Sequence, residues 1–316
     1  MNFIYLTQID SIKQQSTIDA GVFLTHLIHV GWLKGLYTST LAFDIAQFFS
    51  SLNHHLLSLI LNKAGFNSQI SSFFSDYLIN KKMQYVWNSL VLPFFKADIG
   101  VEQSFALFSI PSVLYITSIF HIFEKRTKSF LSSIPISTLS FVNNELLISQ
   151  EKNYEKSNTS LFHRYNIISS LFTQFDLVIE YNKSEIFYFL RLTKNIYLPP
   201  LYFHPLGGLF LYPKDTWRYL SFFFNKKLSF QHHVHHYANK VLSTIKGIKI
   251  LGNSNRELSP IYKRLLYRTC VLPIALYSLQ LWYFKGVLLF QPLKELKKMQ
   301  RKVALWITEA FLTFST

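Results

Sequence analysis

The order of apolar and polar residues predicts a chain in which buried strands alternate with amphipathic helices. Residues 41–45 form a short, mostly apolar run around Asp44, which is typical of a buried strand. Ser50 and Ser51 are predicted to cap a helix that Gly65 ends, because apolar residues recur at helical spacing between them.

The next part of the chain continues this mixture of helices and strands. Gly100 opens a turn, and the largely apolar run that follows it to residue 123 predicts a helix. The other segments with a clear pattern are predicted as a helix at 71–77, strand and turn at 85–95, a helix at 159–175, strand–turn–strand at 177–189 around Asn182 and Lys183, and a strand at 217–224.

A tight hairpin is predicted at 136–149, where two apolar, β-prone runs flank Asn143 and Asn144. Successive side chains on a strand point to opposite faces, so Glu145 is expected on the face opposite Asn144.

From about residue 235 the pattern becomes helical, with helices predicted at 237–251, 260–282 and 292–306. In the last helix Met299 and Val303 belong to an apolar stripe, and the lysines and arginines lie largely off it. A helical region after a body of mixed strands and helices predicts an α+β fold.

Positive charge is concentrated in the C-terminal third of the 316-residue chain. The whole chain has a formal charge of +15, and residues 240–302 alone contain 13 Lys and Arg against two Glu, a net +11. A basic region beside a nearly balanced body is typical of a protein that binds nucleic acid, although a solvated basic face has the same composition.

Cysteine and histidine usage gives little sign of a metal site. Cys270 is the single cysteine, which excludes an intramolecular disulfide, and its apolar neighbours predict a small core residue. The cluster His232, His233, His235 and His236 has neither cysteines nor nearby carboxylates. These histidines are therefore interpreted as surface or stacking residues.

Residues 105–123 contain no charged residue and approach the length of a membrane span. Pro111, Thr117 and His121 make the segment semi-polar, so no membrane partner is expected, and a membrane-associated protein remains the weaker alternative. Asp10 and Asp19 disfavour a secretory signal, which predicts an intracellular location, nuclear or cytoplasmic.

Several short segments occur in a defined order: Asp44 with Phe49 five positions later, Gly100-Val101-Glu102-Gln103, Phe141-Val142-Asn143-Asn144, Asn182-Lys183-Ser184-Glu185, and Arg218-Tyr219-Leu220-Ser221. In this order and at these separations, they resemble the palm motifs of the reverse transcriptase of non-LTR (LINE-type) retrotransposons. Ser16 to Ala20 resemble the stretch between fingers and palm, and Lys298 to Lys302 resemble the helical region after the palm.

The resemblance implies a polymerase palm, an antiparallel sheet with helices, at 41–230. It also implies a remnant of the fingers–palm connection at 1–40 and a basic, thumb-like helical region at 231–316. Most of the fingers and an endonuclease domain are expected to be missing. The ancestral activity is RNA-directed DNA polymerisation with Mg²⁺, an RNA template and a DNA primer.

The resemblance also implies a role for individual residues. Asp44 becomes a Mg²⁺ ligand, since this hard cation prefers carboxylate oxygens, and Lys183 a general acid for pyrophosphate. Without the resemblance, Asp44 is a surface residue at a strand end and Lys183 an exposed turn lysine. The nucleotide-binding positions are Phe49, Gln103, Ser104 and Phe105. The nucleic-acid-binding positions in the basic region are Lys240, Lys246, Lys249, Lys294, Lys297, Lys298, Arg301 and Lys302.

The departures from the family pattern affect the positions that bind the metal and the nucleotide in the family. Asn143 and Asn144 replace the two catalytic aspartates, which leaves Asp44 as the only obvious anionic metal ligand. Phe105 places a ring where the backbone of the family approaches the nucleotide. The sequence therefore predicts a reverse transcriptase-like domain without activity, or a non-catalytic module that binds nucleic acid without sequence preference.

The departures share a mutational signature. Every one can arise from a single C-to-T or G-to-A transition, which indicates the directional silencing that some fungi impose on repeated DNA. The eight positions are Ser104, Phe105, Phe108, Ser109, Asn143, Asn144, Asp176 and Ser221.

We therefore predict that an alignment of the gene with an intact sister copy will show almost exclusively such transitions. Third codon positions that leave the protein unchanged provide the control, because selection on the protein does not act on them. A balanced mixture of transitions and transversions would refute the silencing hypothesis.

Overall fold

The computed structural model describes residues 7–10, 12–79, 81–103, 106–128, 138–191, 198–203, 209–252, 258–283 and 290–308. The chain divides into two compact units. Unit 1 contains Met1–Ala20 and His26–Lys214, and unit 2 contains Gly21–Thr25 and Asp215–Thr316. The predicted mixture of helices and strands is confirmed.

Unit 1 is built on a four-stranded antiparallel sheet with the strand order β6-β7-β1-β8. The strands are β1 (Tyr37–Ala46), β6 (Thr138–Phe141), β7 (Asn144–Glu151) and β8 (Val178–Phe189). The predicted strand at 41–45 is the middle of β1. Leu41, Phe43 and Ile45 point to the same face of β1 and are buried in the core.

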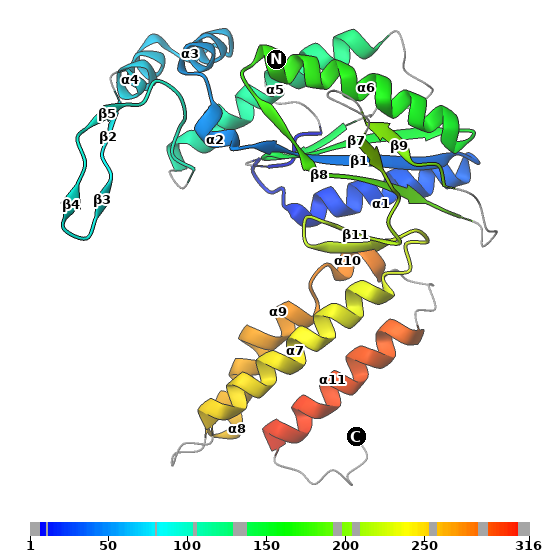
Figure 1. The fold of residues 1–316 in the computed structure, drawn as a ribbon. Coiled ribbons are helices and arrows are strands. Elements are labelled where there is room, and N and C mark those ends of the chain that lie inside the picture. The colour runs from blue at the N-terminus through cyan, green and yellow to red at the C-terminus, as the bar shows by residue number, and fades with distance from the viewer. Residues whose placement is uncertain are drawn as a thin grey trace. The chain divides into compact units, whose positions relative to one another are not determined.

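Helices cover both faces of this sheet (Figure 1). On one face lie α5 (Ser109–Thr127) and α6 (Tyr154–Gln174), where Phe43 meets the ring of Tyr165 at 6.0 Å. On the other face lies α1 (Thr17–Leu33). The side-chain nitrogen of Gln150 on β7 donates a hydrogen bond of 2.8 Å to the Leu27 carbonyl of this helix. Residues 109–123 of the apolar run thus belong to α5, which is largely buried. No helix among the described residues is long and apolar enough to span a membrane.

The segment between β1 and α5 holds α2 (Phe48–Ser51), α3 (His54–Lys63), α4 (Ser68–Leu78) and the short η1 (Ala106–Phe108). The prediction that Ser50 and Ser51 cap the helix is wrong. Asn53 caps α3 instead, because Leu52 is extended and the Asn53 side chain accepts a hydrogen bond of 3.0 Å from Leu56 N. The helix predicted at 71–77 is confirmed as part of α4, and an exposed ribbon follows with β2 (Lys82–Met83), β3 (Val86–Trp87), β4 (Leu90–Val91) and β5 (Phe95–Lys96).

Two strand predictions need correction. Residues 177–189 are one strand, β8, because both halves pair with β1, and the residues between Glu180 and Glu185 form a bulge where a turn was predicted. The segment 217–224 is a hairpin of β11 (Thr216–Tyr219) and β12 (Phe222–Asn225) in unit 2. A second small hairpin pairs β9 (Leu201–Phe203) with β10 (Leu209–Leu211) in unit 1.

The helices of unit 2 pack around a small apolar core. The elements are α7 (Gln231–Gly252), α8 (Pro260–Leu266), the π-helical turn η3 (Tyr267–Val271), α9 (Leu272–Ala275), α10 (Leu279–Trp282) and α11 (Phe290–Thr308). Met299 and Val303 are buried as the apolar stripe predicted. The single helix predicted at 260–282 is interrupted by this π-helical turn. Cys270 is exposed and not buried as predicted, because the turn changes the spacing of core-facing residues and Val271 takes the core position.

The turn between β11 and β12 has a backbone conformation that asparagine and glycine adopt more readily than the residues present. Leu220 and Ser221 both have positive φ angles, 46° and 68°, as a two-residue type I′ hairpin turn requires. Asn-Gly is the preferred sequence for that turn, and L side chains rarely adopt this conformation. The hairpin is therefore held together despite its turn residues, by strand pairing and burial of Trp217 and Phe222.

We predict that Ser221→Gly raises the free energy of unfolding by about 1 kcal/mol, because glycine adopts the left-handed region without strain. The matched control is Ser243→Gly, on the exposed face of α7, which should lower it by about 0.5–1 kcal/mol through loss of helix propensity. Chemical denaturation of the full chain measures both. Equal effects at the two positions would contradict the turn assignment.

Candidate functional site

Three polar residues form a row across the central strands of unit 1. Asp44 on β1 is the register partner of Asn144 on β7 and of Glu180 on β8. Directly paired residues point to the same face of a sheet, so the three side chains share one face. The sequence indicated Asp44 and Asn144, but not Glu180. Glu180 lies in the row because β8 is a single bulged strand that pairs with β1.

The tip of the β6–β7 hairpin lies at the end of this row. Its turn is Val142-Asn143, and Asn144 already belongs to β7, so the predicted Asn143-Asn144 turn is displaced by one residue. The tip is tied to β1 by Ile45 N, which donates to the Asn143 carbonyl at 2.9 Å. The Asn144 amide nitrogen donates to Asn143 Oδ1 at 3.1 Å, so the two neutral side chains bond to each other.

The backbone of the tip is strained. Val142 has a φ of 59°, a conformation that is a genuine outlier for a β-branched residue. Strain of this kind costs about 1–3 kcal/mol and persists where the surrounding structure enforces it, often at functional sites. The strain at Val142 therefore marks the tip as a candidate functional turn.

An ammonium group lies between the two carboxylates of the row. Lys183 comes from the β8 bulge, and its Nζ lies 3.8 Å from Asp44 Oδ2 and 3.8 Å from Glu180 Oε2. Burial raises the pKa of Asp44, the charge of Lys183 lowers it, and Glu180 and Glu185 raise it further. The Lys183 side chain is 61% exposed, so this arrangement contributes little to stability. The arrangement nevertheless places the positive charge of Lys183 beside Asp44.

Glu145 lies outside the row, as strand alternation predicted. It pairs with Phe43 and Ser140, and Ser140 Oγ donates a hydrogen bond of 2.8 Å to its Oε1. Its Oε2 is buried and has no hydrogen-bond partner among the described residues. Complete burial raises the pKa of Glu145 well above its usual value, because an ionised carboxylate loses its hydration there.

A cavity of about 200 Å³ lies beside the hairpin tip. Phe49, Gln103 and Val142 line it together with Asp10, so two predicted nucleotide-binding residues come together there. Asp10 was not predicted as part of this site, because no sequence pattern links residue 10 to the hairpin; a parallel bridge from Gln8 to Ser140 brings the N-terminal segment there. Ser104 and Phe105 lie outside the described residues.

Unit 1 offers few ligands for a metal ion. Among the residues that the structure describes, no group of three histidines, cysteines or carboxylates could hold a metal. Asp44 and Glu180 are the neighbouring carboxylates of the row, and both face the Lys183 ammonium. The donor set therefore does not fit a two-metal centre, which needs several carboxylates held in place.

The predicted nucleic-acid-binding residues of unit 2 are largely at the surface. α7 and α11 pack against each other (Figure 1). Most of the lysines and arginines described on these two helices are exposed. Lys249 belongs to α7, but its side chain lies outside the described part. Lys263 is buried. The exposed predicted residues are Lys240, Lys246, Lys294, Lys297, Lys298, Arg301 and Lys302, to which the structure adds Arg264 and Arg268.

Comparisons with known proteins give a match in structure only. No protein-family model matches the chain, and no curated protein matches it. The structure of telomerase from Candida albicans in complex with the TWJ fragment of telomeric RNA is similar, with a TM-score of 0.52 and 9% identity over 97% of this chain and 52% of that chain.

Telomerase from Candida tropicalis gives weaker matches. Its complex with the TWJ fragment of telomeric RNA has a TM-score of 0.46 at 9% identity, over 92% of this chain and 53% of that chain. The apo enzyme has a TM-score of 0.43 at 13% identity, over 57% of this chain and 33% of that chain. The chain thus spans between 33% and 53% of the length of these three proteins. The Candida albicans match shows that the chain has a fold similar to that of this telomerase.

The buried Glu145 makes stability depend on pH. A carboxyl whose folded-state pKa is raised binds more protons in the folded than in the unfolded state, so stability falls as pH rises above about 4.5. We predict that Glu145→Gln removes much of this fall and raises the free energy of unfolding at pH 8 by about 1–3 kcal/mol, with little effect at pH 4. Denaturation at several pH values tests it, with the exposed Glu155→Gln as control. A gain that does not grow with pH would show that Glu145 is ionised in the folded protein.

Proposed function

We propose that this chain is a reverse transcriptase-like domain of a non-LTR retrotransposon that binds nucleic acid and has lost polymerisation. One observation carries the loss of activity. The hairpin tip beside Asp44 ends in two amides bonded to each other, and the chain's own Lys183 ammonium lies against Asp44. Unit 1 would be the palm and unit 2 the thumb-like region.

Electrostatics supports the loss of the metal site. A carboxylate about 4 Å from Mg²⁺ gains roughly 8 kcal/mol before desolvation at an effective dielectric constant of about 20. Each Asp-to-Asn change removes such a term. Lys183 also repels a divalent cation from the two remaining carboxylates, so productive Mg²⁺ binding at Asp44 is not expected.

Retained nucleic-acid binding rests on the exposed basic residues of α7, α8, η3 and α11 in unit 2. Phosphate contacts by Lys and Arg are sequence-independent and do not require a metal centre. The Candida albicans telomerase of similar fold is bound to an RNA fragment, which agrees with RNA as a partner of this chain. A non-catalytic binding module, without any polymerase role, is the second candidate, and the same basic surface favours it.

We predict no template-directed primer extension by the chain with Mg²⁺ or Mn²⁺ and deoxynucleotides. The double change Asn143→Asp and Asn144→Asp is not expected to restore it, because Phe105 and Lys183 remain. Adding Lys183→Gln to the double variant removes the competing cation and serves as the matched comparison, with metal binding followed by Mn²⁺ paramagnetic resonance. Robust extension by the unmodified chain would refute the proposed inactivity.

We predict that the full chain binds RNA and DNA with little sequence preference and strong salt dependence. If roughly 4–6 phosphates are neutralised, the log of the binding constant should fall with log salt by about 0.9 per contact on duplex DNA. Replacing Lys297, Arg301 and Lys302 by Gln should weaken binding and reduce this slope. The charge-matched control replaces Lys63, Lys125 and Lys152, exposed residues of unit 1. Equal losses in both variants, or salt-independent binding, would contradict the assignment to unit 2.

A further inference from the structure

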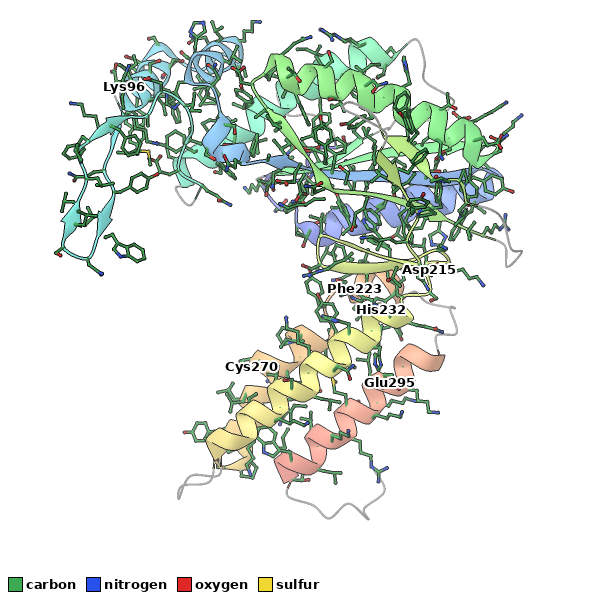
Figure 2. The ribbon with its side chains drawn as sticks, in the orientation of Figure 1. Lys96, Asp215, Phe223, His232, Cys270 and Glu295 are labelled. Carbon is green, nitrogen blue, oxygen red and sulfur yellow. The ribbon has the colours of Figure 1, made fainter. Side chains whose placement is uncertain are left out.

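A second polar cluster lies in unit 2, where the β11–β12 hairpin meets the start of α7 (Figure 2). His232 and His236 are exposed and one helical turn apart, and both pack on the ring of Phe223 from β12. Their ring centroids lie 5.0 Å and 4.6 Å from that of Phe223. Phe223 therefore holds the two imidazoles in a defined place on the surface.

Two permanent cations complete this cluster. Arg218 is the cross-strand partner of Phe223, and its guanidinium carbon lies 5.8 Å from the centre of the Phe223 ring. Lys240 lies one turn beyond His236 on α7, with Nζ 5.9 Å from the centre of the Tyr237 ring. Burial lowers the pKa of His236, and the positive charges of His232, Arg218 and Lys240 lower it further.

The neighbouring histidines differ in environment. His233 is buried, accepts a hydrogen bond from Phe223 N at 3.3 Å and faces the Tyr277 carbonyl at 3.3 Å, and its pKa is lowered to about 4, mainly by burial. It is a structural anchor that stays neutral. His235 is exposed and bonds to Asn239, and no packing on Phe223 is recorded for it among the described residues. His235 therefore provides a control for His232 and His236.

The charges around the cluster select the kind of ligand. Two histidines at i and i+4 could chelate a transition metal, but a metal ion here would face Arg218 and Lys240. The groups whose charges act on His236 are all cationic, and the hydroxyl of Tyr237 donates to the Ser221 carbonyl at 3.1 Å. The carboxylate of Asp215, at the start of this hairpin, is paired with Lys226 at 2.6 Å. An anion is the ligand that this set of groups favours.

We infer that Arg218, His232, His236 and Lys240 form a proton-coupled binding site for a backbone phosphate of a nucleic-acid strand. The inference rests on the proposed nucleic-acid binding and adds its regulation. Without a ligand, the cations around His236 disfavour its protonation. A bound phosphate stabilises the charged imidazoles, so binding takes up protons and affinity rises as pH falls.

The test measures the affinity of the full chain for a fluorescent oligonucleotide between pH 5.5 and 8 at constant salt. We expect the dissociation constant to fall by at least about threefold towards pH 5.5, through proton uptake by one or two histidines. The double variant His232→Gln/His236→Gln should lose this pH dependence, and His235→Gln should keep it. Circular dichroism over the same range checks folding, since His233 becomes protonated only at more acidic pH.

A second readout follows the imidazole signals of His232 and His236 by NMR titration, with and without the oligonucleotide. Their apparent pKa values should rise in the complex, and that of His235 should change less. Binding that is independent of pH, or equally pH-dependent in the double variant, would overturn this inference and leave nucleic-acid binding intact. Absence of binding at every pH would overturn both the inference and the proposed binding function.

Discussion

The pairing register of β1 with β7 and β8 is the constraint on which the rest of unit 1 depends. A shift of one residue would turn Asp44 towards α6 and would turn Phe43 to the face on which Asp44 now lies. Burial of Phe43 against Tyr165 and Phe172 therefore favours the register that places Asp44 beside Asn144 and Glu180. The core determines which side chains meet, and the side chains determine whether they can act on a substrate.

The backbone retains features that the present side chains do not explain. Asp176 and Ser221, two of the positions that depart from the family pattern, have φ angles of 55° and 68°. Glycine adopts that conformation at no steric cost, whereas other L residues do so at a cost, so the backbone is strained at both positions. Some replacements have gained partners: Asn53 donates to Asp176 at 2.7 Å, and Phe108 is fully buried beside Phe74 and Tyr77. The fold therefore accommodates the residues present at these positions.

Hydrophobic periodicity predicted the elements whose burial decides their conformation. β1 and α4 follow this rule, as do the buried Met299 and Val303 of α11. The error at 177–189 occurred where tertiary pairing overrides local preference. Asn182 and Lys183 have the composition of a turn, but β1 holds both flanks of that segment in one sheet, and the extra residues become a bulge. Glu180 and Asp10 could not be assigned to the site beforehand, because their proximity to it depends on pairings between distant segments.

Catalysis and nucleic-acid binding respond differently to the same mutational pressure. A metal-dependent polymerase needs its carboxylates held to within fractions of an ångström, so the loss of two of them removes the reaction. Binding to a phosphate backbone is shared among many cations, each of which contributes a similar, independent amount. The exposed lysines and arginines of α7 and α11 thus form a surface on which single losses are small. The proposed loss of synthesis and the proposed retention of binding therefore differ physically: the first depends on a few accurately placed carboxylates, and the second on many exposed charges.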